Sequence, residues 1–181
     1  DGGSAVAESS DQNENSESQD QESVEVDEGL FNVEVSFPAD FFGEELQLTQ
    51  EQVDDTVAEE GWVSGKIENG IVTYVMPKSE RDQYLLDQKD ALDESIQTEF
   101  DQNPGVYEEI TYNDNLSEFE AVVDRAAFEN TFTFFAFSVV IQAGFYQLFD
   151  GTPEADRGVV INYVDKDTGE VFDTYDSNDL S

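Results

Sequence analysis

Apolar and polar residues alternate along residues 31–37 of the 181-residue chain, and this period of two is typical of a β-strand with one buried face. The apolar positions of the stretch are Phe31, Val33, Val35 and Phe37. Pro38 follows directly and, because proline lacks a backbone N–H donor, it ends the predicted strand.

Two apolar runs in residues 62–77 flank the dipeptide Asn69-Gly70, which predicts a β-hairpin. Asn and Gly tolerate the positive φ angles that both central residues of a two-residue type I′ turn require. The turn sets the register, so that the ring of Tyr74 is expected to lie over Gly65. The pairs expected on the apolar face are Ile67 with Val72, Gly65 with Tyr74 and Val63 with Met76.

A short helix is predicted between Thr49 and Gly61. Thr49 and Gln52 have the spacing of a capping box, and Gly61 is a typical stop residue. A second, long amphipathic helix is predicted from residue 78 to Pro104, which ends it together with Gly105. Ser79 and Asp82 are expected to form its capping box. Its apolar face comprises Leu85, Leu92, Ile96 and Phe100.

Residues 131–149 contain no charged side chain, although 51 of the 181 residues are charged. Their length is close to the roughly 20 apolar residues that cross a bilayer. Five of the nineteen are polar, however, and the acidic Glu129 and Asp150 stand where a membrane span usually has basic anchors. We therefore interpret the stretch as the central helix of a folded domain, apolar around most of its axis because other elements cover it.

This interpretation assigns faces to the helix. The residues expected to face a sheet are Phe134, Phe137, Ile141, Phe145 and Leu148. The row beside them comprises Phe135, Val139, Gln142 and Tyr146. Gln142 and Gln147 are expected to find hydrogen-bond partners or to reach solvent, and Gly151 is expected to cap the end of the helix.

Further strands are predicted in residues 106–113, 119–124, 158–165 and 169–176, with Lys166-Asp167-Thr168 as the turn of the last hairpin. The complete order is β-α-β-β-α-β-β-α-β-β. It predicts an α+β fold, in which an antiparallel or mixed sheet is built from hairpins and three helices pack on one face.

Composition divides the chain into two parts. Residues 1–28 hold ten acidic residues, no Lys or Arg and no aromatic residue, so we expect a disordered acidic tether. Residues 29–181 have the aromatic and β-branched content of a single α+β domain. Because the chain begins with Asp1, we also expect that an upstream segment has been removed.

The net charge of −37 excludes whole classes of partner. Such a surface repels the phosphates of nucleic acids and anionic lipid head groups, whereas cationic partners remain open. An adaptation to high salt or low pH would explain the same charge. The chain has no Cys and no His, which excludes disulfides, thiolate or imidazole metal sites and Ser-His-Asp catalysis. No cofactor is predicted.

Asp165, Asp167 and Glu170 could supply oxygen ligands to calcium. The EF-hand pattern requires Gly at its sixth position and Glu at its twelfth, but here Gly169 is fifth and the twelfth is Asp176. A hairpin turn explains these residues better.

Three other candidates have simpler structural explanations. A glycosidase needs only two carboxylates at a suitable separation, and 44 acidic residues make any one pair uninformative. Ser64 and Lys66 share a strand face and could form a Ser-Lys dyad, but that face is expected to be the solvent side of the hairpin. Trp62 could stack on a ligand, although packing at the end of a strand is the more common role.

The combination of three segments resembles a group of exported lipoproteins of Gram-positive bacteria that have no established activity. The segments are FNVEVSFPADFFG (31–43), EEGWVSGKIENGIVTYVMPK (59–78) and FYQLFDGTP (145–153), followed by a terminal hairpin. The resemblance implies export, a cell-surface location and a tether to a lipid carried by a Cys upstream of residue 1. It implies no catalytic, metal-binding or cofactor-binding residue.

We therefore expect a non-enzymatic extracytoplasmic binding or interaction domain of a membrane-anchored lipoprotein, with a protein, peptide or glycan as its unidentified ligand. The membrane would be contacted only through the lipid anchor. One alternative is a small carboxylate-based hydrolase acting on cell-wall or dietary glycan. A pocket with two carboxyl groups facing each other would favour it, whereas an exposed aromatic patch would favour the binding domain. A calcium-dependent adhesion module is the third possibility. The oligomeric state is left open.

Overall fold

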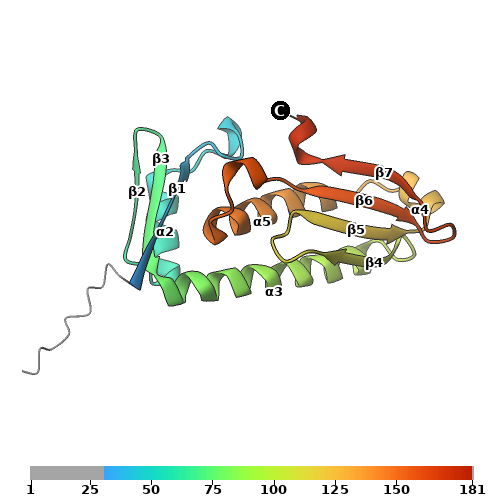
Figure 1. Cartoon of the computed structure of the whole chain (residues 1–181), viewed down its shortest axis with the longest axis horizontal. Coiled ribbons are helices and arrows are strands. Elements are labelled where there is room, and N and C mark those ends of the chain that lie inside the picture. Colours follow the sequence, from blue (N-terminus) through green and yellow to red (C-terminus); the bar gives the residue numbers. More distant parts are fainter. Residues whose placement is uncertain (1–30, 181) are drawn as a thin grey trace, which may run out of the picture.

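The computed structural model describes residues 31–180, and the predicted tether of residues 1–28 lies outside the described residues. Figure 1 shows an elongated arrangement in which one long helix runs beside two separate groups of strands. The α-helices of the described part are α2 (Gln50–Glu60), α3 (Lys78–Gln102), α4 (Arg125–Glu129) and α5 (Phe135–Asp150). Its strands are β1 (Asn32–Pro38), β2 (Ser64–Glu68), β3 (Ile71–Pro77), β4 (Tyr107–Tyr112), β5 (Glu118–Val123), β6 (Val160–Asp165) and β7 (Val171–Asp176).

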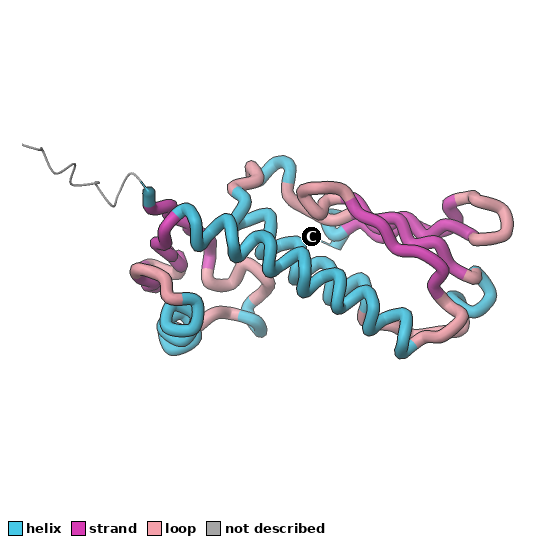
Figure 2. Tube along the Cα trace, turned by 90° about the horizontal axis from the view of Figure 1, so that it is seen from below, coloured by secondary structure: helices cyan, strands magenta, loops and turns pink. Residues whose placement is uncertain are grey.

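The α+β class and the predicted order of elements are confirmed, with the short α4 as an addition. The strands, however, form two sheets. Sheet A has the order β1-β3-β2 and is antiparallel, while sheet B has the order β4-β5-β6-β7 and is mixed, because β5 and β6 run parallel. The length of α3 explains the division. Its 25 residues span about 37 Å and separate β3 from β4, as Figure 2 shows from below.

The hairpin of β2 and β3 has the predicted register, with Gly65 opposite Tyr74. Asn69 and Gly70 adopt φ angles of 52° and 77°, as a type I′ turn requires. A Cβ atom added to Gly65 would lie 2.7 Å from Val53 of α2 and 2.9 Å from the ring of Tyr74. Gly65 is therefore the residue that lets α2 and Tyr74 pack closely on the hairpin.

The predicted ends of the helices are confirmed for α2 but only in part for α3. Thr49 and Gln52 form the capping box of α2, and Gly61 ends α2 in the left-handed conformation. The predicted capping box of Ser79 and Asp82 is wrong, because α3 begins at Lys78, directly after Pro77. β3 passes into α3 without a loop, so that Ser79 already lies inside the first turn, where its side chain cannot cap.

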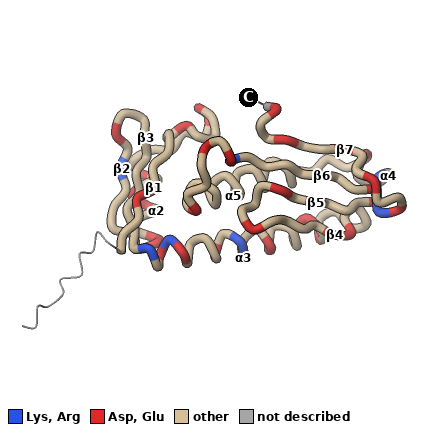
Figure 3. The backbone as a smooth tube through the Cα atoms, in the orientation of Figure 1, with Lys and Arg blue, Asp and Glu red and all other residues tan. Residues whose placement is uncertain are grey.

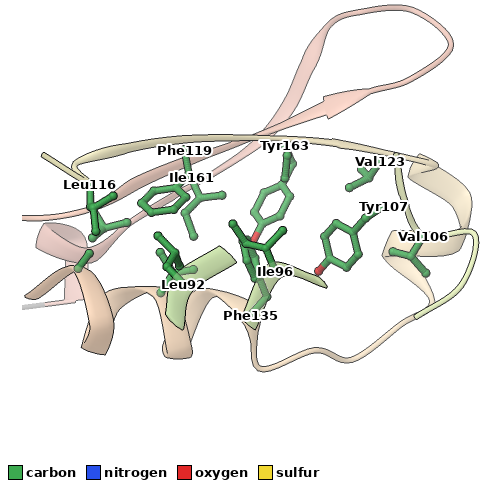
Figure 4. Close-up of a cluster of buried hydrophobic side chains, with 14 of the residues drawn as sticks. Leu92, Ile96, Val106, Tyr107, Leu116, Phe119, Val123, Phe135, Ile161 and Tyr163 are labelled. Atoms are coloured by element: carbon green, nitrogen blue, oxygen red, sulfur yellow. The ribbon is translucent and has the colours of Figure 1, made fainter. Parts of the chain in front are cut away.

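Two hydrophobic cores hold the sheets to the helices. The first lies between sheet B, α3 and α5, and Figure 4 shows its side chains, among them Leu92, Phe119 and Phe135. The second packs sheet A against α2 and the end of α5, with Phe149 among its buried residues. Helix α5 thus contributes to both cores. Its buried residues are Phe135, Val139, Ala143, Tyr146, Gln147, Leu148 and Phe149.

The uncharged stretch is a core helix, but its predicted orientation is confirmed only near its end, where Leu148 is buried and Phe145 packs against the second core. Phe134 and Phe137, which were expected to face a sheet, are 68% and 57% exposed. In the row that was expected beside them, Phe135, Val139 and Tyr146 are buried and Gln142 is half-buried. The apolar residues surround the axis of α5 on all sides, so the sequence pattern does not select one face. No helix within residues 31–180 is long and apolar enough to cross a membrane.

Gln147 lies in the middle of the fold and is 1% exposed. Its Nε2 atom is 2.9 Å from the carbonyl oxygen of Gly158 and 3.2 Å from those of Asn115 and Leu116. Its Oε1 atom accepts a hydrogen bond from the backbone N–H of Gly158 at 2.9 Å. One side chain thereby joins α5 to the β4–β5 turn and to the loop before β6. The predicted need for partners is confirmed for this residue.

Replacement of Gln147 by Leu is expected to lower the free energy of unfolding by about 2 kcal/mol, because it removes four hydrogen bonds of a buried side chain and leaves the partly buried N–H of Gly158 without its acceptor. The matched variant is Gln142→Leu on the same helix. Gln142 makes one side-chain hydrogen bond, to Ser95, so we expect a change within about 1 kcal/mol. Urea unfolding followed by circular dichroism measures both, and equal losses would contradict the role of Gln147.

Candidate functional site

Three phenylalanines within six residues are exposed to solvent. Phe132, Phe134 and Phe137 are 82%, 68% and 57% exposed, and the rings of Phe132 and Phe134 meet edge to face with their centres 5.0 Å apart. Residues 131–134 have no regular secondary structure and connect α4 to α5. Single exposed apolar residues are common on protein surfaces, but a group of aromatic rings is a typical feature of a binding site.

A groove of about 610 Å³ lies beside these phenylalanines, between the second half of α3 and the start of α5. We call it the α3–α5 groove. The α3 wall consists of Ala91, Glu94, Ser95, Thr98, Glu99, Gln102 and Asn103. The opposite wall consists of Phe132, Thr133, Phe134, Phe135, Ser138, Val139 and Gln142. Phe137 is not among the lining residues.

The spacing of the lining residues explains why the groove exists. The residues of the α3 wall come as Ala91 followed by three neighbouring pairs, 94/95, 98/99 and 102/103, and this repeat of three to four positions keeps them on one face of the helix. Several of them are small, such as Ala91 and Ser95, and Ser138 is a small residue of α5 on the other wall. Small side chains on facing helices leave space that larger apolar residues would fill.

The charge of the groove is entirely negative. Glu94 and Glu99 line it, and none of its lining residues is Lys or Arg. Beyond Lys89, every charged residue of α3 is acidic, as Figure 3 shows in red. The last turn of α3 has no basic residue, so the partial negative charge of the helix C-terminus is not offset there.

Burial raises the pKa of the Glu99 carboxyl, because removal from water disfavours its charged form. Hydrogen bonds with Tyr107 and Thr133 lower that pKa in part. The Oε1 atom of Glu99 also accepts a hydrogen bond from Nδ2 of Asn103 at 2.9 Å. The side chain of Glu99 is thus held in place by hydrogen bonds, while its partial burial disfavours the charged form of the carboxylate.

Gln142 supplies a second unusual group in the α3–α5 groove. Its Nε2 atom donates to Oγ of Ser95 at 2.9 Å, and Ser95 donates onward to the carbonyl oxygen of Ala91 at 2.9 Å. The Oε1 atom of Gln142 is buried and accepts no hydrogen bond from any described residue. The predicted hydrogen-bond partner is therefore present for the amide nitrogen of Gln142 but not for its oxygen. A buried acceptor without a donor costs about 1–3 kcal/mol, so a ligand that donates a hydrogen bond would gain at this position.

The residues considered as calcium ligands form a hairpin turn, as predicted. Oδ1 of Asp165 accepts the backbone N–H of Asp167 at 2.8 Å, and the backbone oxygen of Glu170 accepts the N–H of Asp165 at 2.9 Å. Gly169 takes the positive φ angle of the turn, 72°. Among residues 31–180, no group of three or more acidic side chains comes together as metal ligands.

The remaining candidates, Ser64, Lys66 and Trp62, have structural roles or lie outside the groove. Ser64 and Lys66 are exposed on β2, and Nζ of Lys66 pairs with Glu68 at 3.0 Å. Trp62 is buried, which confirms its packing role. The aromatic rings around Trp62, with centres 5.1–5.4 Å away, are Tyr74, Tyr84 and Phe149.

The exposed phenylalanines and the groove were missed by the sequence interpretation, which placed residues 131–149 in one buried helix. A signal was nevertheless present. The segment Thr131-Phe132-Thr133-Phe134 alternates with a period of two, which does not fit a helix and separates it from the helical pattern that follows.

Comparisons with protein-family models, with curated proteins and with solved structures find no match. The function is therefore inferred from the residues of the α3–α5 groove themselves.

Replacement of Glu99 by Gln is expected to raise the melting temperature at neutral pH. The raised pKa of Glu99 means that the folded state holds its proton more tightly than the unfolded state does, so its ionisation destabilises the fold as the pH rises through the folded-state pKa. The gain in melting temperature should shrink as the pH falls toward the ordinary value of 4.5. Differential scanning calorimetry at several pH values measures it.

The control for this prediction is Asp101→Asn, which removes one exposed negative charge from the same helix without touching the groove. It corrects for the general relief of repulsion in a chain of net charge −37. We expect the rise in melting temperature to be larger and more dependent on pH for Glu99→Gln than for Asp101→Asn. Equal rises with the same pH dependence would contradict the burial of the Glu99 carboxylate.

Proposed function

We propose that the protein is a non-enzymatic binding or interaction domain whose ligand occupies the α3–α5 groove. The observation that carries the proposal is the position of the exposed Phe132 and Phe134 on one wall of the groove. Exposed aromatic rings cost solubility and contribute little to the fold, whereas they supply large contact areas in binding sites. A groove of about 610 Å³ also has the size of typical ligand sites.

The hydrolase alternative has less support. A glycosidase places its two carboxyl groups on either side of the bond that it breaks. In the α3–α5 groove, Glu94 and Glu99 both come from α3, and the lining residues of the opposite wall include no carboxyl group. The geometry of the groove therefore favours binding without hydrolysis.

We further propose that the domain is held at the outside of the cell by a lipid anchor upstream of residue 1. The support is the acidic, aromatic-free composition of residues 1–28 and the resemblance to exported lipoproteins. The position of the groove is compatible with such an anchor. β1 pairs with β3, which leads directly into the start of α3. The groove lies along the second half of α3, and its centre is about 30 Å from the start of that helix.

The location is tested by expressing the gene from its natural start in a Gram-positive host. We expect the product to partition into the detergent phase of a Triton X-114 extraction and to be degraded when intact cells are treated with protease. A product that stays in the aqueous phase, or that intact cells protect, would contradict the lipid-anchored surface location. Residues 1–181 expressed alone serve as the aqueous-phase control.

The binding function is tested on residues 1–181 with arrays of defined short peptides and of defined glycans. Phe132→Ala combined with Phe134→Ala is expected to weaken binding of the selected ligands at least tenfold while the melting temperature changes little, because both rings are exposed. The matched control is Phe31→Ala with Leu86→Ala, which removes two exposed apolar side chains outside the groove. Ligands that bind the Phe132/Phe134 variant as well as the natural protein would contradict the proposal.

A further inference from the structure

The chemistry of the α3–α5 groove points to a particular class of ligand. We propose that the groove binds an extended basic peptide segment, with a Lys or Arg side chain beside Glu94 and Glu99 and a neighbouring apolar side chain on Phe132 and Phe134. This inference rests on the proposed binding function. Four features of the groove support it.

The first feature is the sign of the charge. The α3 wall carries Glu94 and Glu99 and ends at the C-terminal turn of the helix, whose carbonyl groups add partial negative charge. None of the residues that line the groove is Lys or Arg, so no cation of the lining neutralises the wall. A positively charged ligand is attracted to such a wall, and an anionic one is repelled.

The second feature is the buried acceptor of Gln142. Its Oε1 atom accepts no hydrogen bond within the described part of the chain, although Gln142 lines the groove. The Lys ammonium has three N–H donors and the Arg guanidinium has five, and neither has an acceptor. A basic side chain carries donors for this acceptor, whereas a carboxylate or an ester of the ligand carries none; because the Oε1 atom is buried, the amide of Gln142 has to turn toward the groove to be reached.

The third feature is the pair of aromatic rings. The faces of Phe132 and Phe134 attract a cation through their π electrons and also accept apolar contacts. The long aliphatic part of a Lys or Arg side chain uses both properties at once. A carboxylate on one wall and aromatic rings on the other thus match a side chain with an apolar stem and a charged end.

The fourth feature is the length of the groove. The α3 wall runs from Ala91 to Asn103, which corresponds to about 18 Å of helix. An extended peptide of about five residues covers that distance, whereas a single amine would leave most of it empty.

Other occupants fit less well. Residues 1–28 of the chain carry ten acidic residues and no Lys or Arg, so they would be repelled by the α3 wall. A second copy of the chain brings a net charge of −37 with it. A neutral glycan could stack on the phenylalanines but would gain no ionic attraction from the two glutamates of the α3 wall.

The proposal is tested by isothermal titration calorimetry of residues 1–181 with an acetylated and amidated peptide, Leu-Ser-Lys-Ser-Leu. The measurement is made in 0.15 M salt, where long-range attraction to the acidic surface is screened beyond about 8 Å. We expect binding by this peptide and by its Arg analogue. Replacement of the central Lys by acetyl-lysine or by Glu is expected to weaken binding at least tenfold.

The protein variants locate the contact. Glu99→Gln and Gln142→Leu are each expected to weaken binding of the Lys peptide at least fivefold, while Asp101→Asn changes it less than twofold. Because Glu99→Gln is expected to stabilise the fold, a loss of binding in that variant cannot be explained by unfolding. Equal effects of Glu99→Gln and Asp101→Asn would overturn the inference, since the peptide would then respond only to general negative charge.

The pH dependence provides a second readout. The titratable groups that interact with Glu99 are Tyr107 from β4 and Tyr163 from β6. Burial raises the pKa of Tyr107 to about 12 and also raises the pKa of Tyr163, so both tyrosines stay neutral. Binding of the Lys peptide is therefore expected to weaken as the pH falls through the raised pKa of Glu99. The Glu99→Gln variant should lack that step.

The outcomes separate this inference from the proposed function. If peptides bind, and lose affinity in the Phe132/Phe134 variant, but show no preference for a basic residue, the ligand class is wrong and the binding groove stands. If no peptide and no glycan depends on these phenylalanines, the proposed function is wrong as well. Strong binding of the Glu-containing peptide at the groove would overturn the inference directly.

Discussion

The rigid length of α3 is the constraint on which the rest of the structure depends. Because β3 and β4 stand at opposite ends of this 25-residue helix, the strands cannot form one sheet, and two cores result. Helix α5 joins the two cores, with Tyr146 in one and Phe149 in the other. This double role explains why α5 is apolar around its whole axis and why Gln147 has to tie it to the surrounding loops.

The α3–α5 groove follows from the same arrangement. The two helices approach each other over residues such as Ser95 and Ser138, which are too small to fill the space between them. Larger apolar residues would extend the first core, and a neutral side chain at Glu99 would avoid the cost of burying a carboxylate. The chain instead has glutamates, an unsatisfied amide and exposed phenylalanines at this position. Residues that stabilise the fold less than an apolar or neutral residue would at the same position are typical of functional sites.

Local patterns predicted the local structure well. The Asn69-Gly70 turn and the capping box of Thr49 and Gln52 depend on neighbouring residues alone, and both were found as expected. The orientation of α5 could not be predicted, because its partners are distant in sequence and its apolar residues surround the axis. The groove was missed for a related reason. Its walls are contributed by α3 and by residues 132–142, and only the packing of both helices against sheet B brings these segments together.

The order in which the elements meet also has a consequence for how the chain folds. β5 pairs with β6 across the whole of α4 and α5, and the core that contains Phe37 of β1 closes only when Phe149 arrives. Contacts between such distant residues slow folding, because a long loop has to close before they form. Neither core can be completed while the chain is still being synthesised up to α5. Within residues 31–180, both cores therefore close only after α5 has been added, and the first core also requires β6.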